Sequence, residues 1–269
     1  MISRCQLAII ASLLLVLGVT YWPRMPYAPK PGYLLNEKPS DLKSRIEALT
    51  VIQAVNERNR QIRTFTCPEI KIRIWNKEFI KLTGNMAYEK DKNFRMIVKS
   101  IITKELDLGS NESYFWFWSR RMKPSVLYYS KHENLYRTGL RTPFHPLWMK
   151  GSLGLDEIPT SGIHARRRGF NWEFLQLTRN TQGKRVLRSI LVDPKRSIIV
   201  GQYVYKDSKL MVSSEIYEYR DGLPHRAIVK WYEEDVVMIL EFVNPKINQG
   251  IIPSTWVRPS MRGEIEIGE

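Results

Sequence analysis

Alternation between hydrophobic and polar residues is the main pattern of the chain beyond residue 60. Residues 70–74 alternate strictly between isoleucine and a basic residue, which predicts a strand with one buried face and one face in water. Comparable runs recur as far as residue 243 and are separated by turn-forming stretches such as 193–195 and 220–224. The series predicts a mostly β fold with few helices, built on a large antiparallel sheet of about eleven strands that curls, splits or closes.

Helical periodicity is clearest in residues 40–59. Ser40 and Asp41 can cap the start of this helix. Behind them, hydrophobic residues recur at helical spacing and predict one apolar face, while charged residues take the other. The apolar face contains Leu42, Ile46, Leu49, Ile52 and Val55. A second, short helix is expected between residues 143 and 153.

Residues 114–118, Tyr-Phe-Trp-Phe-Trp, form a predicted strand that is bulky and apolar on both faces. An antiparallel sheet with one face in water needs polar residues there, so both faces of this strand must be covered. The helix over 40–59 can cover one face, and a curled sheet with a helical cover encloses an apolar cavity of the kind that binds ligands. The expected cavity residues are Ile72, Ile74, Leu82, Met96, Val98, Trp116 and Trp118. The expected lid residues are Leu42, Ile46, Leu49, Ile52, Leu147 and Trp148.

Two alternatives stay open for this region. The interior of the curled sheet can be a filled core that has no cavity. Phe115 and Phe117 can also belong to the core while Trp116 and Trp118 line the opposite face.

The N-terminal residues 1–22 have the pattern of an export signal. A short positive region that includes Arg4 precedes the apolar run 7–19. The best small-residue cleavage site is poor, so a cleavable signal peptide and an uncleaved signal anchor both fit. Residues 23–39 are rich in proline and predict an extended tether, which leaves 40–269 as the folded domain. The domain is therefore expected outside the cytoplasm, in a periplasm or cell envelope.

The formal net charge of +15 favours partners that carry negative charge. Nucleic acid is not expected, because the chain is exported and lacks the RNA-recognition signature. Anionic lipid head groups fit better, and a basic loop at Arg166, Arg167 and Arg168 is the expected membrane-facing site. The chain has 2 cysteines, one of them in the leader, so no disulfide scaffold is possible within one chain.

Residue patterns for catalysis and metal binding are missing from the sequence. The 4 histidines have no metal-ligand spacing, and there is no nucleophile elbow, phosphate-binding loop or dinucleotide motif. Glu105 and Asp107 are two residues apart on one strand face, where solvated carboxylates are expected instead of an acid–base pair. The sequence therefore predicts a protein that is not an enzyme and that uses no cofactor and no metal.

A family resemblance rests on residues 82–118. A strand that ends in Gly84 is followed by a Phe-Arg strand at 94–95, an Asp-x-Gly-Ser-Asn turn at 107–111 and a Trp-rich strand at 115–118. This order resembles divergent relatives of the LolA/LolB-like periplasmic lipoprotein carriers. The resemblance implies an unclosed β-barrel of about eleven strands with helices at its mouth, and an apolar cavity for acyl chains of lipoproteins or other lipids.

Two hypotheses for function follow from these patterns. In the first, the protein binds lipid or lipoprotein acyl chains in the envelope of a Gram-negative type of bacterium and transfers them to a membrane. In the second, it is a membrane-anchored structural or interaction module with a filled barrel and a protein partner in the envelope.

Overall fold

The computed structural model describes residues 42–76, 78–90, 93–137, 151–179 and 184–268. The predicted leader (1–22), the tether (23–39) and most of the expected helix at 143–153 lie outside these residues, so the predictions for them stay predictions. Within the described part of the chain, no helix is both long enough and apolar enough to cross a bilayer.

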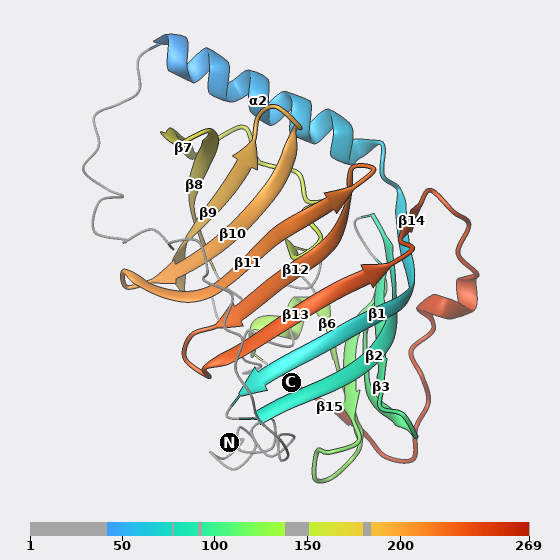
Figure 1. Cartoon of the computed structure of the whole chain (residues 1–269). Coiled ribbons are helices and arrows are strands. Elements are labelled where there is room, and N and C mark those ends of the chain that lie inside the picture. Colours follow the sequence, from blue (N-terminus) through green and yellow to red (C-terminus); the bar gives the residue numbers. More distant parts are fainter. Residues whose placement is uncertain (1–41, 77, 91–92, 138–150, 180–183, 269) are drawn as a thin grey trace.

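One long sheet with two wings forms most of the fold (Figure 1). The first wing consists of β1 (Thr64–Asn76), β2 (Glu78–Glu89), β3 (Asn93–Lys99), β4 (Lys104–Ser110), β5 (Tyr114–Ser119) and β6 (Leu127–Lys131). The second wing consists of β7 (Ile163–Arg168), β8 (Asn171–Arg179), β9 (Arg185–Asp193), β10 (Ile198–Lys206), β11 (Lys209–Arg220), β12 (Leu223–Trp231) and β13 (Val236–Val243). The shorter elements are β14 (Lys246–Ile247), β15 (Glu264–Glu266) and the 3-10 helices η2 (His132–Arg137) and η4 (Pro253–Trp256).

Strand β1 joins the two wings, because it pairs with β2 on one side and with β13 on the other. The strand order is β15-β6-β5-β4-β3-β2-β1-β13-β12-β11-β10-β9-β8-β7, with β14 paired to β1. The ends of this order, β15 and β7, do not pair, so hydrogen bonds do not close the sheet. These findings confirm the expected large antiparallel sheet and unclosed barrel. The sheet has 15 strands where about eleven were expected, and β7, β14 and β15 were not among the predicted strands.

The two wings curl toward each other and share one apolar core. Phe115 and Tyr128 from the first wing belong to the same buried cluster as Val212, Val229 and Trp231 from the second. Because side chains alternate across each strand, this cluster defines the concave face of the sheet. The opposite faces of the same strands form the convex side.

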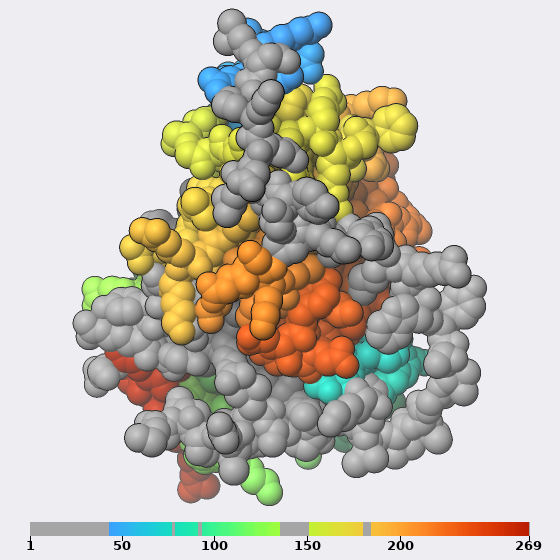
Figure 2. Space-filling model, turned by 90° about the vertical axis from the view of Figure 1, so that its left-hand side faces the viewer, coloured from blue at the N-terminus to red at the C-terminus, as the bar shows by residue number. Residues whose placement is uncertain are grey.

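Helix α2 (Leu42–Arg60) covers one end of the concave face. Figure 1 shows it along the upper ends of the second wing, and in Figure 2 it lies above β7 to β9 (yellow). Ile52 and Val55 pack on Trp172, Phe174 and Ile190. The expected cover by this helix is therefore present.

The buried face of α2 differs from the predicted one. Ile46 and Leu49 were expected to face the sheet, but they are 58% and 44% exposed. Ala48, Asn56 and Asn59 are buried in their place. The prediction was wrong because it used hydrophobic spacing alone, and two buried asparagines turn the helix toward their hydrogen-bond partners.

The segment around Gly109 is a strand, not the expected turn. Strand β4 continues through Ser110, and the turn begins at Asn111, whose side-chain oxygen accepts hydrogen bonds from the N–H groups of Ser113 (3.0 Å) and Tyr114 (2.8 Å). Gly109 is opposite Trp116 in the β4–β5 register, and a Cβ atom there would lie 2.1 Å from the indole. Likewise, β2 does not end at Gly84 but continues to Glu89.

We predict that Gly109→Ala destabilises the fold, because its Cβ would overlap a fully buried indole. The expected loss in the free energy of unfolding is about 2 kcal/mol, measured by urea denaturation. Gly250→Ala is the matched control, because nothing lies within 4 Å of its added Cβ. Equal stability of the two variants would contradict the packing described for Trp116.

Candidate functional site

The concave face brings together most of the residues expected to line a cavity. Ile72, Leu82, Met96 and Val98 are buried in the cluster that both wings share. Ile74 is partly buried and packs against that cluster. Sequence alternation therefore located this apolar wall correctly. Its role in ligand binding stays a prediction.

Trp116 and Trp118 lie on the convex side, which corrects the expectation that they line the cavity. Phe115 and Phe117 belong to the concave cluster, so the residues between and after them point the other way. The Trp116 indole N–H lies 3.4 Å from a carboxylate oxygen of Asp107, on that convex side. The alternative in which the two phenylalanines form the core is confirmed.

Residues 151–158 form an inner cover that the sequence did not predict. Leu153 and Leu155 enter the cluster shared by the wings, and Ile158 enters the smaller cluster beneath α2. The segment therefore lies between helix α2 and the concave face. Of the expected lid residues, Leu147 and Trp148 lie outside the described residues, as does the side chain of Leu42.

Two asparagines of α2 hold this inner cover. The Asn56 side chain donates to the carbonyl oxygen of Ile158 (2.8 Å) and accepts from its N–H (2.7 Å). Asn59 donates to the carbonyl oxygens of Gly154 (3.2 Å) and Asp156 (2.8 Å). These bonds satisfy main-chain groups that burial would otherwise leave unpaired, so helix and cover are held together as one unit.

Polar side chains from the sheet hold the other side of the cover. Arg188 of β9 lies 3.1 Å from the Asp156 carboxylate and also donates to Gln202 of β10 at 2.6 Å. The Gln202 amide in turn donates to the carbonyl oxygen of Gly151 at 2.8 Å. The cover is thus attached by hydrogen bonds and one ion pair as well as by apolar contacts.

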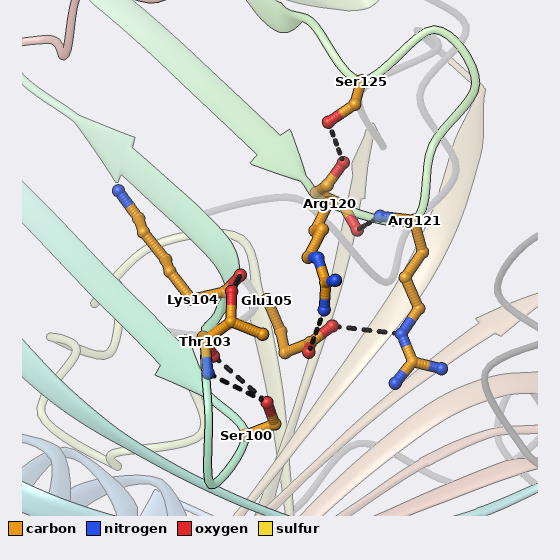
Figure 3. Close-up of polar contacts among 8 residues, drawn as sticks. Ser100, Thr103, Lys104, Glu105, Arg120, Arg121 and Ser125 are labelled. Carbon is orange, nitrogen blue, oxygen red and sulfur yellow. Dashed lines mark hydrogen bonds and ion pairs between the residues drawn. The ribbon is translucent and has the colours of Figure 1, made fainter.

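The expected solvated carboxylates, Glu105 and Asp107, are both buried, which corrects that prediction. Asp107 accepts hydrogen bonds from Arg95 (3.0 Å) and Lys104 (2.5 Å). Burial raises the pKa of Asp107, but these two cations lower it by more, so its pKa lies below the ordinary value. Glu105 meets Arg120 (3.5 Å) and Arg121 (3.0 Å) at the base of the β5–β6 loop (Figure 3).

The three arginines expected in a membrane-facing loop lie in strand β7. Arg166 contacts the fully buried Glu173 at 2.7 Å, and Arg168 lies 3.8 Å from the same carboxylate. Arg167 pairs with Glu47 of α2 at 3.1 Å. The loop prediction was wrong because charge alone cannot show that a buried acid on the next strand pairs with these side chains.

The turn between β3 and β4 exposes two adjacent isoleucines that the sequence analysis did not select. Ile101 and Ile102 are fully exposed at its tip. The Ser100 N–H donates to the carbonyl oxygen of Thr103 at 2.9 Å, and the Thr103 N–H donates to the Ser100 hydroxyl at 3.3 Å. The closed turn therefore holds the two hydrophobic side chains away from the core. Figure 3 shows the contact between Ser100 and Thr103 that closes the turn.

Basic residues surround this tip. The β3–β4 turn and the neighbouring β5–β6 loop contribute Lys99, Lys104, Arg120, Arg121 and Lys123. Their positive charge exceeds the negative charge of Glu105 and Asp107. The surface thus combines exposed apolar groups with a positive surround, and an Ile-Ile pair between basic residues is the sequence signal that could have identified it.

Among the described residues, no group of three His, Cys, Asp or Glu side chains is placed to hold a metal ion. Cys67 is buried in the core, and burial raises the pKa of its thiol to about 11. A thiol with so high a pKa is a poor nucleophile at neutral pH.

Comparison with solved structures identifies the fold. A domain assigned as an outer membrane lipoprotein-sorting protein of Vibrio parahaemolyticus has a TM-score of 0.55 and 8% identity, over 77% of this chain and 95% of that chain. A DUF1329 family protein of Desulfovibrio piger has a TM-score of 0.54 and 9% identity, over 77% and 96%. A LolA superfamily protein of Nitrosomonas europaea has a TM-score of 0.50 and 12% identity, over 78% and 97%.

These similarities confirm the expected LolA-like fold. No family model and no curated protein matches the chain. At such low sequence identity, structural similarity establishes the fold but does not identify a ligand.

We predict that the ion pairs of Asp107 make the free energy of unfolding depend on pH in the acidic range. Asp107→Asn should lower the free energy of unfolding at pH 7 by about 3 kcal/mol, because it leaves Arg95 and Lys104 without their anion. Since the folded-state pKa of Asp107 is lowered, its contribution is complete above pH of about 4 and is lost as pH falls through the folded-state pKa.

Urea denaturation between pH 7 and pH 3 tests this prediction. The difference between wild type and Asp107→Asn should shrink as pH falls. Asp221→Asn, at an exposed turn position, is the control and should show no such difference. A constant difference across this range would show that the ion pairs do not stabilise the fold.

Proposed function

We propose that this protein is a non-catalytic lipid-binding protein of the cell envelope that holds acyl chains of lipids or lipoproteins against its concave face. The observation that carries the proposal is the apolar concave face, to which both wings contribute and over which a polar-anchored cover lies. Acyl chains gain free energy when they leave water for such a surface, at about 0.8 kcal/mol for each buried CH₂ group. The LolA-like fold supports the same proposal.

The inner cover suggests how an acyl chain enters. Leu153 and Leu155 place branched hydrocarbon side chains against the concave face. An acyl chain that displaces them keeps this wall out of water, so the exchange is limited mainly by the polar contacts that Arg188 and Gln202 make between the sheet and the cover. Opening of α2 together with residues 151–158 is therefore the proposed binding step.

The β3–β4 tip is the proposed contact with a membrane. Burying Ile101 and Ile102 in the lipid interface would contribute roughly 1.5–3 kcal/mol for each side chain. The net positive charge of the surrounding lysines and arginines would strengthen this contact at an anionic surface. This tip and the predicted leader support an envelope location and a membrane partner.

We predict that Met96→Gln weakens binding of a fluorescent fatty-acid probe at least fivefold, because it puts an amide on the apolar concave wall. Ile97→Gln is the matched control, since the next residue on β3 points to the convex side. Fluorescence titration measures both affinities, and native mass spectrometry of protein purified from membranes tests for co-purified lipid. Protein that is repeatedly empty and binds no probe would favour the filled-scaffold alternative.

We also predict that the double variant Ile101→Ser, Ile102→Ser loses most of its binding to vesicles that contain phosphatidylglycerol. Vesicle co-sedimentation measures this effect, and added salt should weaken wild-type binding because the basic surround is exposed. Ile252→Ser, at an exposed isoleucine outside the β3–β4 tip, is the control. Equal binding by the tip variant and the control would remove the tip from the proposed function.

A further inference from the structure

Two buried polar atoms on adjacent strands have no hydrogen-bond partner within the part of the chain that the structure describes. They are the hydroxyl oxygen of Ser214 on β11 and the indole nitrogen of Trp231 on β12. Ser214 is 7% exposed and Trp231 is 4% exposed. More than about 90% of buried polar groups in proteins are paired, so two such atoms on neighbouring strands need a physical explanation.

Both side chains face the concave side. Trp231 belongs to the cluster shared by the wings, and so do Val212 and Ile216, which flank Ser214 on the same face of β11. In the β11–β12 register, Trp231 is opposite Val212, whereas Ser214 is opposite Val229. Ser214 and Trp231 are therefore diagonal neighbours, a relation of about 7–8 Å that an aromatic side chain can span.

On the convex side of the same strands, polar side chains do have hydrogen-bond partners. There, the Ser213 hydroxyl lies 3.4 Å from the Tyr232 hydroxyl. The Glu215 carboxylate accepts a hydrogen bond from Tyr203 at 3.1 Å. Protein side chains thus satisfy polar groups at Ser213 and Glu215, one position before and after Ser214, whereas no described residue pairs with the polar atoms of Ser214 and Trp231.

The chemistry of the pair restricts what can bind to it. An indole N–H only donates, and a hydroxyl can donate as well, so one carbonyl oxygen with two lone pairs can accept from both. A carboxylate would bring a charge into an apolar wall, which costs far more than a neutral carbonyl does. A hydrocarbon chain without a carbonyl would leave both protein atoms unpaired.

We propose that Trp231 and Ser214 bind the ester or amide carbonyl of an acyl lipid, and that they make this site selective for acylated lipids over ether-linked ones. The inference rests on the proposed lipid-binding function and deepens it by naming the chemical class of the ligand. The acyl chain lies on the apolar wall around Val229, and the carbonyl meets the two polar atoms.

The test compares two phosphatidylglycerols that have the same head group and chain length but differ in linkage, one diacyl and one dialkyl. Displacement of a fluorescent fatty-acid probe gives both affinities. Two hydrogen bonds to a neutral carbonyl predict that wild type prefers the diacyl lipid by about tenfold. Ser214→Ala and Trp231→Phe should each reduce this ratio toward one.

Ser213→Ala, on the same strand but the convex side, is the matched control and should keep the wild-type ratio. Thermal unfolding of lipid-free Ser214→Ala should show no loss of stability, because the variant removes an unpaired polar atom. If Trp231→Phe does not fold, Ser214→Ala alone decides. Equal affinity of wild type for the two lipids, or an unchanged ratio in Ser214→Ala, would overturn the inference. Failure of both lipids to bind wild type would overturn the proposed function instead.

Discussion

The pairing of β1 on both of its edges is the constraint on which the rest of the structure depends. Its contacts with β2 are local in sequence, but its contacts with β13 bring together residues 69–75 and 237–243. Because of this non-local pairing, the two wings are joined along β1, and their apolar faces turn toward each other. Without it, the cluster that contains Phe115 and Trp231 would be divided between two half-covered sheets.

The sheet also separates charge from hydrocarbon. In a chain with a net charge of +15, two of the buried acids, Asp107 and Glu173, lie on the convex side, and each pairs with more than one cation. Their arginines and lysines satisfy the acids where burial would otherwise neutralise them. The concave cluster of described residues is largely apolar, and the polar groups beside it include those that hold the inner cover and the Ser214–Trp231 pair.

Sequence patterns predicted the strands and the apolar wall because two-residue periodicity reports directly which face is buried. The alternation at 70–74 placed Ile72 correctly, and the covering helix was also found. Sequence patterns did not predict which face α2 exposes or on which side of the sheet Trp116 lies, because both depend on partners that are distant in sequence. Nothing in the composition shows that Asn56 meets Ile158, or that Gly109 makes room for an indole.

An unclosed sheet has two open edges, and each is protected in a different way. The C-terminal β15 adds a short parallel strand beside β6. At the other edge, β7 offers main-chain groups that could recruit a strand from another molecule, the usual route to edge-to-edge aggregation. Its arginines, one tied to α2 through Glu47, put charge and bulk along that edge. The sheet can therefore remain unclosed while both of its edges are shielded from pairing with a second copy of the chain.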